Sequence, residues 1–418
     1  MPTGHRRLAC AVALAALLTA AAPATAKPGP TLRVTMDPNL SRPVDLPPSG
    51  PSVGDRWAIE SRVLDTSGAP VGTFRADQTA IAVGRDSQVV QTQGVFELSD
   101  GSITFAGVAR APLSQTGLAV DEAYERAVTG GTGAYAGAGG TIVTRRRPDG
   151  VYEQTIRLVL PDGEPTPLSI PGIEGPEEKR IDLGDPGIEP GDLIAVRGAI
   201  GDPPGGTILG TQAVVAPEGE TLRVLSSLTF SLPNGQIAAV GPGAIAPEGT
   251  TLLDGRTFVR AVVGGTGAYA GRGGTQTVVR EADGTYRNVL ELWAPRGEVR
   301  RLRFTTRSAA LTTVDAGGGR FDVVQERLRN ARGRQAGRML GVRTSAVDAG
   351  TVTDVTTLAT LRLRGGTVVV GGVEAGRSSR TVSAVMGGTG RYAGVRGTLT
   401  TTAAKRGLVI DLRLRRVG

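Results

Sequence analysis

The sequence predicts an all-β protein of three tandem small antiparallel β-barrels, each expected to have eight strands. Three observations predict this class. A glycine motif recurs at domain-length spacing, alternating strands joined by tight hairpins precede each copy, and the composition is rich in turn residues, with 62 Gly, 26 Pro and 4% aromatics. A chain of 418 residues is also too long for one ordinary core.

The glycine motif is the strongest signal of a repeat. It reads AVTGGTGAYAG from Ala127, AVVGGTGAYAG from Ala261 and AVMGGTGRYAG from Ala384. The copies are 134 and then 123 residues apart, which is the length of a domain rather than a solenoid period. The chain therefore contains three copies of one unit.

Strands upstream of the motif keep a similar order in each copy. Segments beginning at Gly54, Gly191 and Gly318 read GDRWAI, GDLIAV and GGRFDV. In this register Trp57, Ile194 and Phe321 coincide and are expected on the buried face of a strand.

A second strand is then expected to begin near Gly72, Gly210 and Gly341. After it each copy has a hairpin with Asp-Gly, Asn-Gly or Gly-Gly at the turn, the residues that a two-residue primed turn requires.

Composition then predicts the boundaries. We expect a signal peptide at 1–26, a Pro-rich lead-in at 27–51, unit 1 at 52–160, a Pro/Gly/Glu linker at 161–184, unit 2 at 185–306 and an Arg-rich unit 3 at 308–418. The alternative to an ordered arrangement of the three units is that the proline linker lets unit 1 move freely.

The first 26 residues have the layout of a secretory signal peptide. A basic start with Arg6 and Arg7 precedes an apolar run from Leu8 to Leu18, and small residues end at Ala26. The two arginines fit either a general or a twin-arginine export signal. No other stretch is apolar enough for a membrane span, so we expect a secreted, extracellular protein without a transmembrane segment.

Cleavage after Ala26 would remove His5 and Cys10, the only histidine and cysteine in the sequence. The mature chain would then have no thiol nucleophile, no disulfide, no Ser-His-Asp triad and no imidazole or thiolate metal site. We expect no cofactor and no metal, and any proton transfer must use Asp, Glu, Tyr, Lys or Arg.

Positive charge is concentrated in unit 3. Only three of the 47 basic residues are lysines. Ten arginines lie between residues 300 and 338: Arg300, Arg301, Arg303, Arg307, Arg320, Arg327, Arg329, Arg332, Arg334 and Arg338. The cluster is either a solvated surface or a contact for an anionic surface polymer. Interleaved aromatics are lacking, so nucleic acid is not expected.

The motif AVxGGTGxYAGxxGT resembles that of the dirigent and allene oxide cyclase group, whose members are small eight-stranded antiparallel barrels. The resemblance covers most of each unit, but only the glycine motif is specific. It implies a barrel that holds a reactive apolar molecule without a cofactor. Barrels of that group commonly form trimers, so we expect a monomer with an intramolecular pseudo-trimer.

The motif residues are expected to turn the chain sharply at a barrel rim. They are Gly130, Gly131, Thr132, Gly133, Gly264, Gly265, Thr266, Gly267, Gly387, Gly388, Thr389 and Gly390. A phosphate cradle is not expected, because no helix and lysine follow. Tyr135, Tyr269 and Tyr392 either pack on the barrel wall or contact a ligand.

Asp65 and Asp202 are the candidate catalytic residues, with Asn330 as their counterpart in the third copy. The alternative is that they cap a loop, as Asp and Asn often do. Three functions stay open: a protein that binds an apolar or phenolic molecule or a cell-surface component, a cofactor-independent isomerase, cyclase or dirigent-type protein, and a structural or adhesive module with filled barrels.

Overall fold

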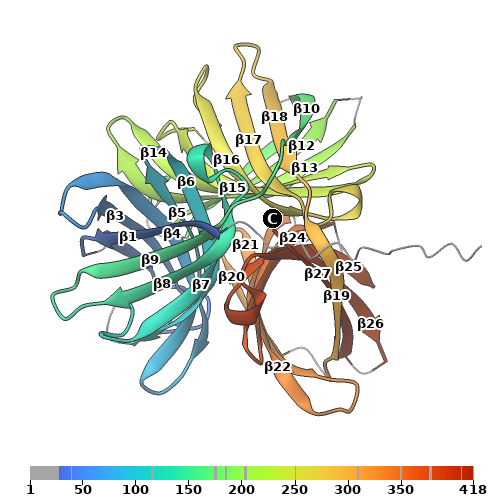
Figure 1. Cartoon of the computed structure of the whole chain (residues 1–418). Coiled ribbons are helices and arrows are strands. Elements are labelled where there is room, and N and C mark those ends of the chain that lie inside the picture. The colour runs from blue at the N-terminus through green and yellow to red at the C-terminus, as the bar shows by residue number, and fades with distance from the viewer. Residues whose placement is uncertain are drawn as a thin grey trace, which may run out of the picture.

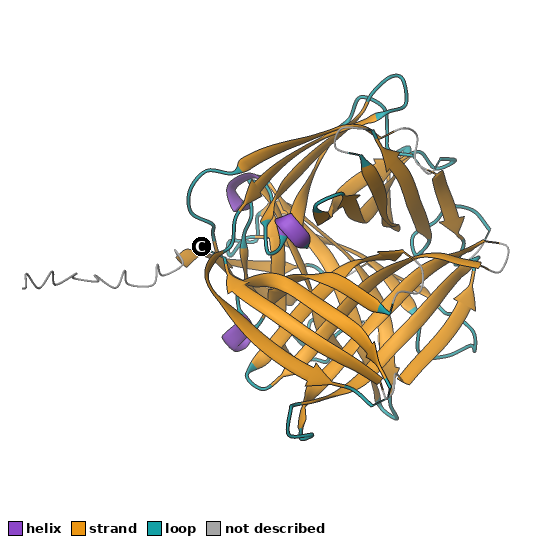
Figure 2. Cartoon of the chain, turned by 90° about the vertical axis from the view of Figure 1, so that its right-hand side faces the viewer, coloured by secondary structure: helices purple, strands orange, loops and turns teal. Residues whose placement is uncertain are grey.

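The structure is a computed structural model of the chain. It describes residues 28–38, 40–113, 117–173, 177–183, 186–201, 205–249, 251–307, 310–348, 351–375, 379–405 and 407–417. The predicted signal peptide lies outside these residues. Strands make up nearly all of the described chain, and short 3-10 turns are its helical elements (Figure 2).

Three nine-stranded antiparallel sheets follow one another along the chain. Barrel 1 contains β1 (Pro28–Met36), β2 (Leu40–Val44), β3 (Arg56–Leu64), β4 (Pro70–Val83), β5 (Ser87–Leu98), β6 (Gly101–Pro112), β7 (Ala123–Gly131), β8 (Gly139–Arg146) and β9 (Tyr152–Val159).

Barrel 2 contains β10 (Thr166–Ile173), β11 (Glu177–Ile181), β12 (Leu193–Ile200), β13 (Gly206–Glu218), β14 (Thr221–Leu232), β15 (Gly235–Ile245), β16 (Thr257–Gly265), β17 (Gly273–Arg280) and β18 (Tyr286–Trp293).

Barrel 3 contains β19 (Arg296–Thr305), β20 (Ala310–Ala316), β21 (Gly319–Arg329), β22 (Gln335–Asp348), β23 (Thr351–Leu363), β24 (Gly366–Ala375), β25 (Arg380–Gly388), β26 (Val395–Ala404) and β27 (Gly407–Arg416).

Each sheet closes through its first strand. In barrel 1, β1 pairs with β9 along its length and reaches β3 at Thr35 and Met36, and β2 then continues along β3. The same closure joins β10 to β12 and β19 to β21. Since β1 and β2 run in succession along one edge of β3, the ring has eight strand positions. The predicted class of three tandem antiparallel barrels is confirmed.

The unit boundaries differ from the predicted ones. The lead-in contains β1 and β2, the linker contains β10 and β11, and β19 begins before the expected start of unit 3. Proline misled the prediction, because proline is tolerated at bulges and in edge strands. The β1 ladder shifts register between Pro28 and Thr31, and Pro43 lies in β2, which pairs with β3 alone.

Two of the predicted registers are also wrong in the later copies. The glycine at the start of the second strand lies opposite the end of the next strand in each barrel, and it is Gly72, Gly206 or Gly337. The predicted Gly210 and Gly341 each lie four residues after the glycine that corresponds to Gly72.

Phe321 is out of register by one residue. It packs in the core between barrels, whereas Trp57 and Ile194 face the interiors of their own barrels. A shift of one residue moves a side chain to the other face of a strand.

The three barrels lie side by side around a common centre (Figure 1). The motif strands β7, β16 and β25 contact one another there. A separate apolar core joins side chains of all three barrels, among them Val95, Ala127, Val263, Phe321 and Met386. The chain thus folds as three barrels around a shared core, without the freely moving first unit that the proline linker suggested.

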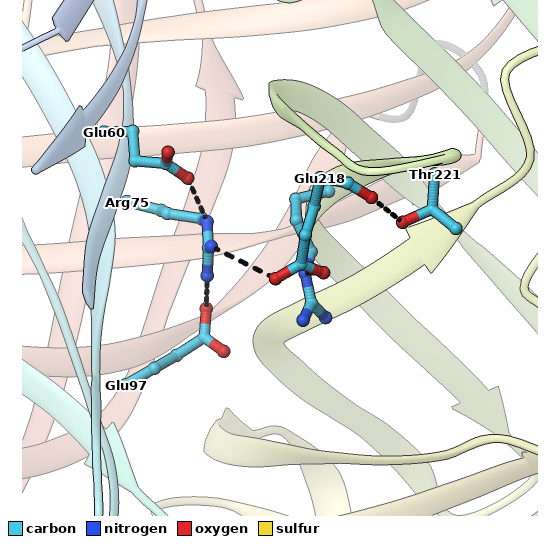
Figure 3. Close-up of polar contacts among 6 residues, drawn as sticks. Glu60, Arg75, Glu97, Glu218 and Thr221 are labelled. Atoms are coloured by element: carbon cyan, nitrogen blue, oxygen red, sulfur yellow. Dashed lines mark hydrogen bonds and ion pairs between the residues drawn. The ribbon is translucent and has the colours of Figure 1, made fainter. Parts of the chain in front are cut away.

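A polar cluster centred on Arg75 also joins barrels 1 and 2 (Figure 3). Its Nε donates to Glu60 Oε2 at 2.7 Å and its Nη1 to Glu97 Oε1 at 2.5 Å, both within barrel 1. Its Nη2 lies 4.0 Å from Glu218 Oε1 of barrel 2, and Glu218 also pairs with Arg223.

Candidate functional site: the barrel interiors

The glycine motif holds the barrel end together and joins the barrels. Thr132, Thr266 and Thr389 each accept a hydrogen bond from the backbone N–H that follows the hairpin glycine, at 3.0, 3.1 and 3.1 Å. The next residues, Gly133, Gly267 and Gly390, have φ of 57°, 58° and 56°, which favour glycine. These contacts give the motif a structural role in every copy.

The three motif tyrosines end short 3-10 turns, η1 (Gly133–Tyr135), η2 (Gly267–Tyr269) and η3 (Gly390–Tyr392). Tyr135 and Tyr392 are buried and Tyr269 is partly buried, each against the core of its own barrel. None of them lines the cavities described below. Their position fits packing.

Asp65 lies in the loop between β3 and β4, where its Oδ1 accepts hydrogen bonds from the backbone N–H of Ser67 and Ala69 at 2.8 and 3.0 Å. A hydrogen bond from the Ser67 hydroxyl, together with these backbone bonds, lowers the pKa of Asp65. In barrel 3 the Oδ1 of Asn330 accepts the corresponding hydrogen bonds from the backbone N–H of Arg332 and Arg334, at 3.0 and 3.1 Å. Asp202 lies outside the described residues.

The three barrel interiors differ at the residue that directly precedes the glycine motif and at the facing residues of the last strand. Arg126 and Arg260 precede the motif in barrels 1 and 2 and are buried inside them, whereas Ser383 takes their place in barrel 3. The last strand adds Tyr152 and Gln154 in barrel 1 and Tyr286 and Asn288 in barrel 2. Barrel 3 has Leu408 and Ile410 there. Barrels 1 and 2 therefore share an arginine, a tyrosine and an amide at interior positions where barrel 3 has serine, leucine and isoleucine.

Barrel 1 is filled by aromatic rings. Phe74, Phe96 and Phe105 pack with ring centroids 5.0 to 5.8 Å apart. Gly94 makes room for them, because a Cβ atom there would stand 2.7 Å from the Phe105 ring. The guanidinium of Arg126 lies 4.8 Å from the Phe105 centroid.

Barrel 3 contains a cavity of about 220 Å³. Its apolar wall includes Val324, Met339, Ala359, Val370, Leu399 and Leu408. Hydroxyls of Thr357, Ser379, Thr381, Ser383 and Thr401 also line it. Among the described lining residues Arg343 carries the charge, and Leu311, which is 48% exposed, marks the edge toward solvent.

Glu326 lies beside this cavity. It lies on β21, where it pairs with Met339 of β22, and its side chain is 3% exposed. Val324, two residues earlier on the same face of β21, lines the cavity. Burial raises the pKa of Glu326 to about 7, opposed by a hydrogen bond with Thr306. Its Oε1 has no partner among the described residues. A carboxyl with this pKa can exchange protons near neutral pH.

Another cavity, of about 70 Å³, lies where the three barrels meet. Arg56 of barrel 1 lines it and donates to Asp77 Oδ1 at 2.5 Å. Burial raises the pKa of Asp77, and Arg56 opposes that rise.

The Arg-rich unit carries a row of exposed cations on its outer surface. Arg327, Arg338 and Arg362 face one another across the neighbouring strands β21, β22 and β23. Partial desolvation of the exposed Arg362 side chain lowers its pKa, and the charges of Arg110 of barrel 1 and Arg338 lower it further. No ion pair involves these four arginines within the described chain.

Sequence reasoning missed the interior residues Arg126, Arg260, Arg343 and Glu326. The sequence did mark Arg126 and Arg260, because each immediately precedes a copy of the glycine motif. Nothing in the sequence distinguishes Glu326 from its charged neighbours, since its burial depends on the register of β21.

The fold defines a protein of three tandem antiparallel β-barrels that pack around one centre. No protein-family model matches the chain, and no curated protein matches it at a significant level. Among solved structures it is similar to a pyocyanin demethylase, with 21% identity over 31% of this chain and 98% of that chain and a TM-score of 0.26.

It is also similar to the siderophore receptor PirA from Pseudomonas aeruginosa, with 11% identity over 94% of this chain and 81% of that chain and a TM-score of 0.12. Likenesses with these scores carry no argument about function, and the resemblance to the dirigent and allene oxide cyclase group stays a prediction. No helix of the described chain is long and apolar enough to cross a membrane.

Proposed function

We propose that the chain binds a small, largely apolar molecule with an anionic or phenolic group in the interior of barrel 3. The cavity of about 220 Å³ carries this proposal. Its aliphatic wall suits an apolar body, while Arg343 and the hydroxyl side chains suit a carboxylate or phenol. The barrel 2 cavity is smaller, at about 30 Å³, and three phenyl rings pack inside barrel 1.

Isothermal titration with 4-hydroxycinnamate tests the proposal. Val370→Phe places a ring where barrel 1 has Phe105, since both residues follow the hairpin glycine by the same interval. We expect it to weaken binding at least tenfold, while the matched Val370→Ala retains binding. Ser383→Leu is a second blocking variant if Val370→Phe does not fold. Wild-type protein that does not bind, or a folded blocking variant that binds as wild type does, contradicts the proposal.

Arg343 is tested by the charge of the ligand. Arg343→Gln should weaken 4-hydroxycinnamate several-fold and leave the neutral cinnamyl alcohol unchanged. Arg338→Gln, on the exposed face of the same strand, is the matched control and should alter neither affinity. An equal loss for both ligands in Arg343→Gln would show that the guanidinium does not select the anion.

We propose cofactor-independent proton transfer as a second candidate function, which Glu326 favours. Its carboxylate would take a proton from an acidic C–H of a bound molecule and return it to the carbonyl oxygen, an isomerisation that needs no co-reactant. Keto–enol tautomerisation of phenylpyruvate is a suitable probe. The rate should rise through pH 7, and Glu326→Gln should abolish that rise. A rate unchanged in Glu326→Gln rejects catalysis and leaves the binding proposal standing.

We also propose that the exposed row of Arg327, Arg338 and Arg362 contacts an anionic surface polymer. Like charges opposite one another on adjacent strands are destabilising unless an anion lies between them. Retention on immobilised dextran sulfate should fall in Arg338→Glu more than in Arg157→Glu, which makes the same charge change at an exposed site in barrel 1. Equal losses of retention in the two variants would show that the net charge of the protein, and not this row of arginines, determines binding.

Export remains a proposal as well. A protein recovered from the medium of a secreting culture should begin at Lys27, as N-terminal sequencing would show. A chain retained in the cells with its first residues intact would contradict it.

A further inference from the structure

The interior of barrel 2 holds a buried cation. Arg260 is 1% exposed and forms no ion pair in the described chain. Its Nε reaches the carbonyl oxygen of Pro242 at 3.5 Å, and its Nη2 has no partner. Burial lowers the pKa of Arg260 to about 10, so the guanidinium still carries its charge at neutral pH. An unpaired charge in an apolar interior costs several kcal/mol.

Arg260 lines a cavity of about 30 Å³. A single water needs roughly 10 to 15 Å³ of such space, so the cavity has room for about two waters or one small ion. Its wall is mainly aliphatic, with Ile173, Val196, Ile208, Leu228, Leu252 and Val278. Tyr286 also lines it, and its hydroxyl lies close to the backbone N–H of Leu252 and donates to no described residue. Burial raises the pKa of Tyr286 to about 12, so this hydroxyl remains a donor.

Barrel 1 provides an internal comparison. There Arg126 Nη2 donates to Thr144 Oγ1 at 2.6 Å, and the guanidinium lies over the Phe105 ring. Barrel 2 has Val278 at the position of Thr144 and Ala239 at that of Phe105. Arg260 therefore lacks both contacts that Arg126 makes in barrel 1, and a cavity lies beside its side chain.

We infer that barrel 2 binds a small monovalent anion, a halide or a carboxylate group, between Arg260 and Tyr286. The guanidinium supplies charge and a donor, and the phenol supplies a second donor. Glu178 is the other charged residue that lines the cavity. It is partly exposed and has its own interactions, and its charge raises the pKa of Tyr286. The site is separate from the cavity proposed for barrel 3.

Bromide is the direct probe. Crystals of the whole chain soaked in sodium bromide should show an anomalous peak within hydrogen-bonding distance of Arg260 Nη2. The equivalent place beside Arg126 should show none. Arg260→Met should abolish the peak in barrel 2, and the matched Arg126→Met should retain it. No peak in barrel 2, or equal peaks beside both arginines, overturns the inference.

Thermal unfolding tests the site in solution. At constant ionic strength, Tm should rise by a few degrees as chloride replaces the bulky anion gluconate, because a ligand of the folded state stabilises it. Arg260→Met should remove this dependence and Arg126→Met should keep it. If Arg260→Met does not fold, Tyr286→Phe should weaken the dependence several-fold. A variant that responds to chloride as wild type does contradicts the site.

Formate in place of chloride identifies the source of the anion. Stabilisation at lower formate than chloride concentration assigns the site to a carboxylate, and the reverse order assigns it to a halide.

Discussion

Gly130 of barrel 1 lies against Ala261 of barrel 2 so closely that a Cβ atom at Gly130 would stand 2.7 Å from the Ala261 Cβ. The contact repeats around the centre. A Cβ atom at Gly264 would stand 2.9 Å from Ala384, and one at Gly387 would stand 3.2 Å from Ala127. The first glycine of each motif therefore packs on the first alanine of the next copy, and the motif forms the joint between barrels.

Gly130→Ala should therefore lower the free energy of unfolding. The added methyl group has no room beside Ala261, and such overpacking costs about 1 to 3 kcal/mol. Urea unfolding followed by circular dichroism measures it. Gly249→Ala is the control, because a Cβ atom there would meet nothing closer than 3.7 Å. Equal stability of Gly130→Ala and wild type would show that the strands do not meet this closely.

Arg75→Met should destabilise the seam between barrels 1 and 2. It would leave Glu60, Glu97 and Glu218 near one another without the guanidinium that joins them (Figure 3). We expect a loss of about 1 to 3 kcal/mol, less than for a fully buried pair because the carboxylates are partly exposed.

Arg62→Met is the matched control. The Arg62 side chain is 75% exposed and pairs with Asp37 at 2.6 Å, so its loss should cost less than about 1 kcal/mol. Equal losses in the two variants would show that the Arg75 cluster does not hold the seam.

Glu326→Gln should change how stability depends on pH. A carboxyl with its pKa raised from 4.5 to about 7 binds more protons in the folded state between these values. The contribution of the protonated Glu326 to the free energy of unfolding is fully present below pH 4.5 and is lost as the pH rises through 7. The glutamine variant should therefore gain stability over wild type between pH 5 and pH 8, by about 2 kcal/mol.

Urea unfolding at both pH values checks this prediction, with Glu298→Gln at an exposed position of β19 as the control. Parallel pH profiles for wild type and Glu326→Gln would mean that Glu326 titrates normally.

Asp65→Asn should be silent, since Asn330 supports the same loop in barrel 3. Asp65→Ala should destabilise the protein because the backbone N–H groups of Ser67 and Ala69 lose their acceptor. The lowered pKa of Asp65 means that its contribution is present above its ordinary pKa and disappears as the pH falls. Thermal unfolding measures both variants. Loss of phenylpyruvate tautomerisation in a folded Asp65→Asn would instead assign Asp65 to catalysis.

Local sequence determined the class of fold. The hairpin turns at Gly101, Gly235 and Gly366 have φ of 144°, 143° and 149°, values that non-glycine residues rarely adopt, so the turns were visible in the sequence. The three motif copies likewise marked three units, because the same backbone angles and close contacts are needed in each. Both signals depend on neighbours in the chain, and sequence reasoning found both.

Tertiary structure alone decided what lies inside each barrel and what lies between them. Proline content hid β1 and β10, and β19 was assigned to unit 2, since closing a ring joins strands that are far apart in the sequence. One residue of register turned Phe321 toward the centre and Glu326 toward the interior of barrel 3. Whether Arg126 and Arg260 find partners depends on residues of other strands, so the candidate sites could be located only in the folded chain.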